Sequence, residues 1–136
     1  MSEFLFTYGT LNPQHAPDEV KSVVTGLIRY GEGSIPGVLF DLGEYPGAVF
    51  DNSSGSEVFG TVFRLPDAAN ILSELDHYEG FDPGSPSTSL FVRKIRPVVL
   101  TTGENIECWV YEYNGKPVQE RILADGRYDK GNTAAD

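Results

Sequence analysis

The pattern of apolar residues predicts β-strands along most of the chain. Residues 4–8 (FLFTY) form a nearly continuous aromatic and aliphatic run, which is typical of a strand buried on both faces near the centre of a sheet. Residues 57–65 alternate instead, so that strand should have one apolar side. Two longer β-prone runs, 90–100 and 106–113, flank a polar segment that contains Gly103, which predicts an antiparallel hairpin.

One segment has the period of an α-helix. Over residues 67–79 the apolar side chains fall in one stripe at about 100° per residue: Ala68, Ile71, Leu72, Leu75 and Tyr78. Gly80 follows, at the position where a residue in the left-handed conformation ends a helix. A second, short helix is predicted from Pro17 to Val24, with Asp18 as its N-terminal cap.

The remaining segments are predicted to be short strands and turns. Glycines at 31 and 33 and the Pro36-Gly37 pair favour turns between extended pieces in residues 27–42, and residues 82–86 (DPGSP) must be a loop. No repeat or linker divides the chain, and strands outnumber helices.

These elements predict a mixed, α+β fold. We expect a small curved mixed sheet or closed β-barrel with one main helix and one or two short ones. This domain should cover residues 1–128, and residues 129–136 should form a flexible tail.

Composition narrows the possible functions. The chain has 136 residues, of which 20 are acidic and 10 basic, and its net charge of −10 opposes binding to nucleic acid. Cys108 is the only cysteine and there are two histidines, so we expect no disulfide, no metal site and a reducing compartment. No apolar run approaches the ~20 residues that span a bilayer. We therefore expect a cytoplasmic protein without a membrane partner.

Glu79 is a carboxylate on the apolar side of the predicted helix. On the helical wheel it lies between Leu72 and Leu75, whereas Ser73, Glu74, Asp76 and His77 lie toward the opposite face and should be in solvent. Burial and the helix C-terminus would both raise the pKa of Glu79 toward neutrality, which suits a general acid and base. The alternative is that the helix frays before Glu79 and leaves it half-exposed or paired with an arginine.

A second candidate site follows the first strand. In Tyr8-Gly9-Thr10-Leu11 the glycine permits close approach of a ligand, and the following amides are free to bind an anion or an oxyanion. The alternative is an ordinary glycine turn at the end of a strand.

Arg93 and Cys108 also have two interpretations each. Arg93 lies in a strand of mixed character and would either bind a substrate carboxylate or pair with one of the many acidic residues. Cys108 is interpreted as a core residue rather than a nucleophile, because neither histidine is placed to activate it. Tyr45, Tyr111 and Tyr113 are interpreted as core or rim residues.

Several sequence blocks together resemble the gamma-glutamylcyclotransferase-like family. They are FTYGTL at 6–11, LFDLGEYPG at 39–47, VFGTVF at 58–63, LDHYEG at 75–80, FVR at 91–93, WVYEY at 109–113 and the closing segment 122–128. No single block is specific, but their order and spacing cover nearly the whole chain.

The resemblance implies a compact mixed α/β barrel and an enzyme that cyclises a gamma-glutamyl amine or amide to 5-oxoproline with release of the amine. It implies no cofactor, with Glu79 as the acid and base. The substrate-binding residues would be Tyr8, Gly9, Thr10 and Leu11 together with Asn12 and Pro13, and we add Arg93 as a candidate. The reaction is a lyase- or transferase-type intramolecular acyl transfer.

The sequence leaves two points open. The chain departs from the family pattern at Asn12, at Phe91 and at Arg127-Tyr128, so the identity of the released amine is not specified. The oligomeric state is not specified either. The alternative function, from another class, is a non-catalytic module that binds a small molecule on the same fold.

Overall fold

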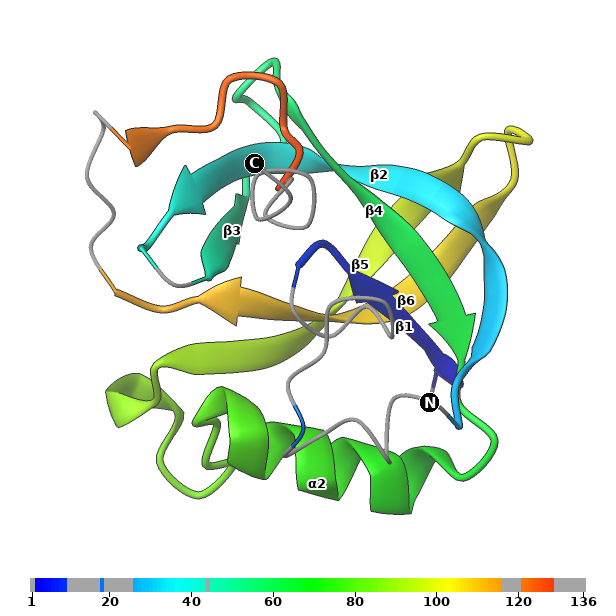
Figure 1. Cartoon of the computed structure of the whole chain (residues 1–136), viewed down its shortest axis with the longest axis vertical. Helices are drawn as coiled ribbons and strands as arrows, with labels where there is room; N and C mark the ends of the chain where they lie inside the picture. The colour runs from blue at the N-terminus through cyan, green and yellow to red at the C-terminus, as the bar shows by residue number, and fades with distance from the viewer. Residues whose placement is uncertain (1, 10–17, 19–25, 44, 116–120, 129–136) are drawn as a thin grey trace.

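The computed structural model describes residues 2–9, 18, 26–43, 45–115 and 121–128 (Figure 1). Its elements, in chain order, are β1 (Phe4–Thr7), β2 (Ile28–Asp41), β3 (Pro46–Phe50), β4 (Glu57–Arg64), α2 (Ala68–Glu79), η1 (Pro86–Thr88), β5 (Phe91–Leu100) and β6 (Asn105–Tyr113). Apart from Asp18, the short helix predicted from Pro17 to Val24 lies outside the described residues, as does the tail predicted over 129–136.

Five of the strands form a closed barrel. The strand order is β3-β2-β4-β1-β6-β5, and β5 pairs again with β2 through Gly33 with Leu100 and Ser34 with Val99. The barrel therefore runs β2-β4-β1-β6-β5 and back to β2, while β3 extends from the far end of β2 (Figure 1). The β1–β6 pair is parallel and the other pairs are antiparallel. The predicted mixed, closed barrel is confirmed.

The predicted hairpin is also present. Strands β5 and β6 pair without interruption from Phe91 with Tyr113 to Val99 with Asn105, and Gly103 has a φ of 93° in the turn between them. Left-handed φ values favour glycine, so the sequence marks this turn directly.

Strand β2 differs from the prediction. The segment predicted to be short pieces separated by glycine turns is one strand of 14 residues, with a bulge between Arg29 and Gly31. Its glycines permit close contact instead of turning the chain. A Cβ at Gly33 would lie 2.7 Å from the carbonyl oxygen of Val99, and one at Gly37 would overlap the carbonyl oxygen of Val49. Because Gly33 and Gly37 have no side chains, β2 can pair closely with a neighbouring strand along each of its edges.

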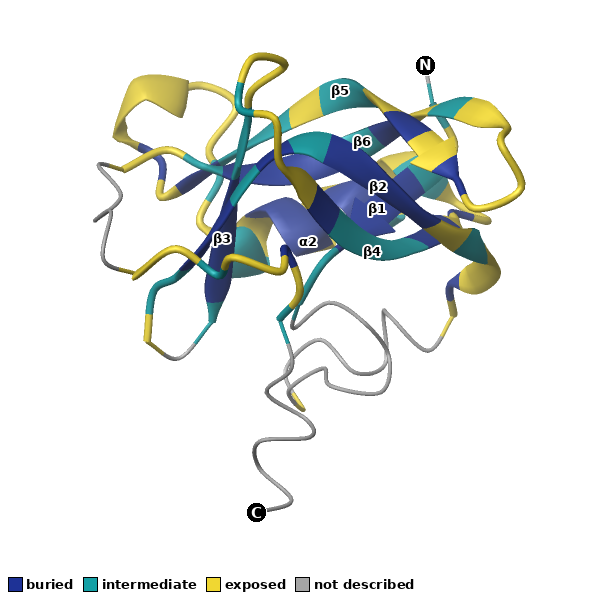
Figure 2. Cartoon of the chain, turned by 90° about the horizontal axis from the view of Figure 1, so that it is seen from above, coloured by how far each residue is buried: buried dark blue, intermediate teal, exposed yellow. Residues whose placement is uncertain are grey.

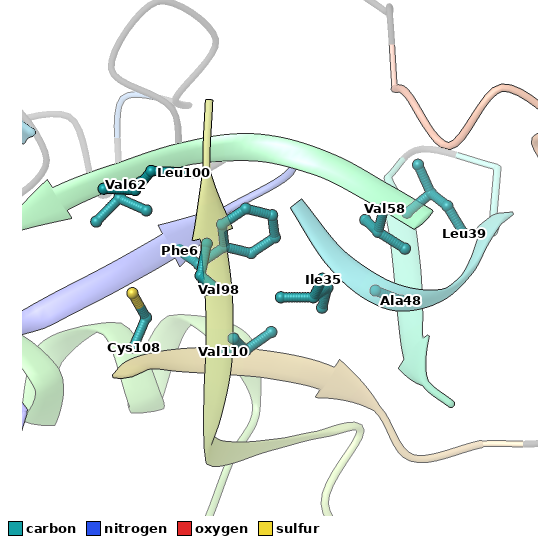
Figure 3. Packing of buried hydrophobic residues seen from close by; sticks show 10 residues of the cluster. All are labelled: Phe6, Ile35, Leu39, Ala48, Val58, Val62, Val98, Leu100, Cys108 and Val110. Atoms are coloured by element: carbon teal, nitrogen blue, oxygen red, sulfur yellow. The ribbon is translucent and has the colours of Figure 1, made fainter. Parts of the chain in front are cut away.

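The interior of the barrel is filled by one apolar cluster. Figure 3 shows its ten buried residues, which point toward one another from the surrounding strands: Phe6, Ile35, Leu39, Ala48, Val58, Val62, Val98, Leu100, Cys108 and Val110. Cys108 is fully buried here, which confirms its interpretation as a core residue.

A second apolar cluster joins the outside of the barrel to α2. It consists of Leu5, Leu27, Phe63, Leu65, Leu72, Leu75, Phe91 and Tyr111. Because successive side chains of a strand point to opposite faces, β1 contributes Leu5 to this cluster and Phe6 to the interior. Strand β1 is thus buried on both faces, as predicted (Figure 2). Strand β4 has the apolar side that the alternation predicts, and its other side is apolar as well: Val62 faces inward and Phe63 faces α2.

Helix α2 ends where the sequence predicts. Gly80 has φ 72° and ψ 32°, and the N–H of Phe81 donates to the carbonyl oxygen of Asp76 at 2.9 Å, which satisfies a free helix-end acceptor. The prediction that Asp76 faces solvent is wrong, because Arg93 and Tyr111 reach its carboxylate from the barrel and leave the residue only 6% exposed. Ser73, Glu74 and His77 are exposed, as predicted. Within the described ranges no helix has both the length and the apolar character to cross a membrane.

The close contact at Gly33 generates the first prediction. Gly33→Ala should lower the free energy of unfolding by about 1–3 kcal/mol, because the added methyl group must displace backbone of β5 at the point of barrel closure. Urea denaturation would measure the change. The matched control is Gly31→Ala in the same strand, where the new Cβ meets only a side-chain carbon of Leu100 at 3.8 Å. Equal stability of the two variants would show that Gly33 does not limit closure.

Candidate active site

A pocket of about 260 Å³ lies between the end of β1, the C-terminus of α2 and the β5–β6 hairpin. Its described lining consists of Phe6, Thr7, Tyr8, Gly9, Tyr45, Pro46, Tyr78, Glu79, Leu90, Phe91 and Tyr111. Small-molecule pockets usually measure about 300–1,000 Å³, so this one suits a ligand of amino-acid size. Most of the lining is aromatic, and Glu79 is the only charged residue among those described.

Glu79 occupies the last position of α2 and reaches the pocket. The helix is regular up to this residue and Gly80 ends it, so the helix does not fray before Glu79. Its side chain is partly buried, and burial raises the pKa of the carboxyl from the ordinary 4.5 to about 7. Within the described part of the chain, no arginine pairs with it and no group donates a hydrogen bond to it. Both features separate Glu79 from the carboxylates of ordinary ion pairs.

Tyr8 and Gly9 bring the end of β1 to the pocket. The Tyr8 hydroxyl donates to the carbonyl oxygen of Tyr111 and accepts from the N–H of Ala48 at 3.2 Å. Burial raises the pKa of Tyr8 far above its ordinary value, so this hydroxyl keeps its proton. Gly9 packs so closely on Pro46 that a Cβ would lie 2.5 Å from the proline Cγ. The glycine therefore has a steric reason to be there, which a simple strand-ending turn does not require.

The other sequence-predicted site residues are not brought to this pocket by the described structure. Thr10, Leu11, Asn12 and Pro13 lie outside the described residues. Arg93 forms an ion pair with Asp76 and lines a separate, more open hollow beside His77 and Phe81. Of the two interpretations of Arg93, the structure shows the pairing with an acidic residue.

The pocket lining also includes residues for which the sequence predicts a place in the core or no role in the site. Tyr111 is buried in the cluster beneath α2 and Tyr45 packs against that cluster, which confirms their interpretation as core or rim residues, and both also line the pocket. The ring of Phe91 lies between those of Tyr45 and Tyr113 in tilted and edge-on contacts, with ring centroids 5.9 and 5.8 Å away. The register of the hairpin could have predicted that these residues lie together. It pairs Arg93 with Tyr111 and Phe91 with Tyr113, all on the face toward α2.

The electrostatics of the site favour proton transfer. Glu112 lies near Tyr8 and adds to its raised pKa, but its carboxylate is paired with Arg96, Nε to Oε2 at 2.6 Å. Among the described residues, Glu79 is therefore the carboxylate at the pocket for which no partner is found, and its surroundings disfavour its charge. In the part of the chain that the structure describes, no group of three or more His, Cys, Asp or Glu side chains could hold a metal ion. A carboxyl with a pKa close to neutral can accept and return a proton.

Comparison with known proteins assigns the class. The sequence model of one family matches residues 5–130. The chain belongs to the gamma-glutamyl cyclotransferase, AIG2-like family. A comparison with curated protein sequences finds no significant match.

Solved structures share the fold. An AIG2-like protein from Mus musculus is 22% identical with a TM-score of 0.70, over 93% of this chain and 88% of that one. YkqA from Bacillus subtilis is 18% identical with a TM-score of 0.70, over 99% of this chain, and the chain spans only 42% of its length. A gamma-glutamyl cyclotransferase is 16% identical with a TM-score of 0.60, over 81% of this chain and 65% of that one. At these identities the likeness shows the fold.

The raised pKa of Glu79 generates a prediction about stability. Between pH 4.5 and about 7, the unfolded chain has lost the proton that the folded protein keeps, so the free energy of unfolding should fall as the pH rises. Glu79→Gln removes the ionisable group and with it this decrease in the free energy of unfolding. The variant should be more stable than the parent by about 1–3 kcal/mol near pH 8 and by much less near pH 5.

Chemical denaturation at the two pH values would measure this difference. Glu74→Gln is the control, because Glu74 lies on the exposed side of the same helix and should show no such pH dependence. A Glu79→Gln protein that is less stable than the parent near pH 8 would show that the charged carboxylate holds the helix end.

Proposed function

We propose that this protein cyclises a gamma-glutamyl amine or amide to 5-oxoproline and releases the amine, with Glu79 as general base and acid. The observation that carries the proposal is the position of the Glu79 carboxyl in a largely aromatic pocket, with a pKa raised to about 7. Catalytic groups work best when their pKa lies near the operating pH. Family membership supports the reaction class.

The proposed reaction needs no nucleophile from the protein. The α-amine nitrogen of the substrate attacks its own γ-carbonyl carbon, which closes the 5-oxoproline ring. Glu79 takes the proton that this nitrogen loses and gives it to the leaving nitrogen as the old C–N bond breaks. Because attack is intramolecular, holding the bent conformer of the substrate removes several kcal/mol of the barrier. The proposed reaction requires no cofactor or metal.

The pocket walls suit the binding of such a substrate. Tyr8 and Gly9 lie at the pocket, and we propose that the loop they begin, with Thr10, Leu11, Asn12 and Pro13, binds the gamma-glutamyl group. Backbone N–H groups of this loop would stabilise the oxyanion that forms on the γ-carbonyl oxygen. The aromatic side chains exclude water from Glu79, which supports its raised pKa.

A substrate panel tests the activity directly. Incubation with a set of gamma-glutamyl amines and dipeptides should yield 5-oxoproline from at least one member, because the chemistry depends on the gamma-glutamyl group common to all of them. Chromatographic detection of 5-oxoproline would measure the product. Calorimetry with the same panel separates the two classes of function: tight binding without product from any member would favour a non-catalytic binding module and contradict the proposal.

Glu79→Gln tests the role of the carboxyl. This change keeps the size and hydrogen bonding of the side chain but removes its ability to accept a proton, so the turnover rate should fall by about 10²–10⁴-fold while the fold is kept. Steady-state kinetics on a substrate from the panel would measure the loss.

The matched control is Glu74→Gln, which removes an exposed carboxylate from the same helix and should leave turnover unchanged. Turnover near the parental rate in Glu79→Gln would remove Glu79 from the mechanism.

A further inference from the structure

The buried carboxylate of Asp76 lies on α2 one helical turn before Glu79. Arg93 of β5 donates two hydrogen bonds to it, from Nε to Oδ1 at 2.7 Å and from Nη2 to Oδ2 at 2.9 Å. The Tyr111 hydroxyl of β6 donates a third, to Oδ1 at 2.6 Å. Two-pronged arginine–carboxylate contacts are among the strongest polar contacts in proteins. Asp76 therefore ties the last turn of α2 to both strands of the hairpin.

Arg93 is itself held in place. Its guanidinium carbon lies 4.3 Å from the ring centroid of Trp109 and 5.8 Å from that of Phe81. Its side chain is only 16% exposed, and in the hairpin register it lies directly opposite Tyr111. Asp76 and the two side chains that donate to it thus form one packed unit, which we call the Asp76 cluster: Asp76, Arg93 and Tyr111.

Tyr111 connects the Asp76 cluster to the pocket. Its side chain contributes to the pocket lining together with Glu79, while its hydroxyl contacts Asp76. Its backbone carbonyl oxygen accepts the hydrogen bond from the Tyr8 hydroxyl. Tyr111 therefore contacts Asp76 through its hydroxyl and Tyr8 through its backbone carbonyl, and so connects the Asp76–Arg93 pair with the pocket that Glu79 enters. Linked hydrogen bonds of this kind restrict the groups that they join.

We propose that Asp76, Arg93 and Tyr111 are positioning residues, which fix the last turn of α2 against β6 so that the Glu79 carboxyl is held beside Tyr8. The inference rests on the proposed function of Glu79. The ion pair is formally neutral, so Asp76 adds no unbalanced negative charge next to the proton-transferring group. Without Arg93, the carboxylates of Asp76 and Glu79 would lie one turn apart on the same helix and repel each other.

Several charged or titratable groups lie near Glu79 and could affect its titration. The described titratable or charged groups around it are Tyr8 after β1, Tyr45 before β3, Asp76, His77 and Tyr78 on α2, Arg93 on β5, and Tyr111 and Glu112 on β6. His77 is exposed, and Glu112 is paired with Arg96. The Asp76–Arg93 pair can thus be changed without altering the described lining of the pocket.

Charge deletions in the Asp76 cluster test the proposal. Asp76→Asn and Arg93→Met each break the two-pronged contact, so the last turn of α2 is no longer held and the Glu79 carboxyl gains access to water. The pH at which Glu79 titrates should therefore fall toward its ordinary value in both variants, because burial is what raises it. Carboxyl-carbon NMR would follow the titration, with Glu79→Gln to assign the signal. Single variants that fold and leave this titration unchanged would overturn the proposal, as would shifts of opposite sign, which the change of charge alone would cause.

Matched controls separate local from general effects. Glu74→Gln and Arg29→Met make the same two charge changes at exposed positions, and neither should move the Glu79 titration. The NMR measurement needs no substrate, so it decides the positioning role even if the substrate panel yields no product.

Two smaller changes in the cluster test the proposal if a single charge deletion prevents folding. Tyr111→Phe removes only one hydroxyl, and amide hydrogen exchange at Gly80 and Phe81, which report on the last turn of α2, should accelerate about tenfold. Arg93→Lys keeps the charge but loses the two-pronged contact.

For Arg93→Lys, kcat should fall by up to about 10²-fold with KM unchanged, because Arg93 lies outside the described pocket lining and the loss concerns only the placement of Glu79. Parental exchange rates in Tyr111→Phe together with parental kcat in Arg93→Lys would show that the cluster only stabilises the fold.

Discussion

The pairing of Gly33 and Ser34 with Leu100 and Val99 joins the two edges of the sheet, and every other part of the molecule depends on this closure. It fixes the path of β5 and, through the hairpin, that of β6. The interior cluster can then close around Phe6 and Cys108, and the outer faces of β5 and β6 form a surface for α2. The contact is possible because Gly33 lacks the side chain that would collide with β5.

The pocket results from the way α2 is attached to this surface. Apolar contacts of Leu72 and Leu75 hold the helix, and the contacts of Asp76 with Arg93 and Tyr111 determine how its last turn lies. Glu79 then enters a space walled by aromatic side chains, where its charged form is poorly solvated. Stability and proposed chemistry thus oppose each other at this residue: the burial that brings its pKa close to neutral also makes its ionised form costly to the fold.

Much of this arrangement could be predicted from local sequence pattern. The β5–β6 hairpin, the buried strand β1, the end of α2 at Gly80 and the place of Glu79 on its apolar side all follow from periodicity and from single residues with strong backbone preferences. The turns predicted at the glycines of β2 are absent, because a glycine that permits a close contact and a glycine that reverses the chain look alike in sequence. The prediction for Asp76 is wrong for a related reason, since a helical wheel ranks polarity but contains no information about a partner on another strand.

The sequence by itself therefore determined the mixed barrel class, the helix with its terminal carboxyl, and the family resemblance carried by blocks spread along the chain. The tertiary structure alone decided which residues meet. It paired Arg93 with Asp76 instead of leaving it free for a substrate, brought Tyr45 and Tyr111 into the pocket wall, and left Glu79 without a partner in the described residues. The physical reason is that local pattern records the preferences of one strand or helix, whereas ion pairs, cavities and shifted pKa values arise from the distances between elements that only closure and packing set.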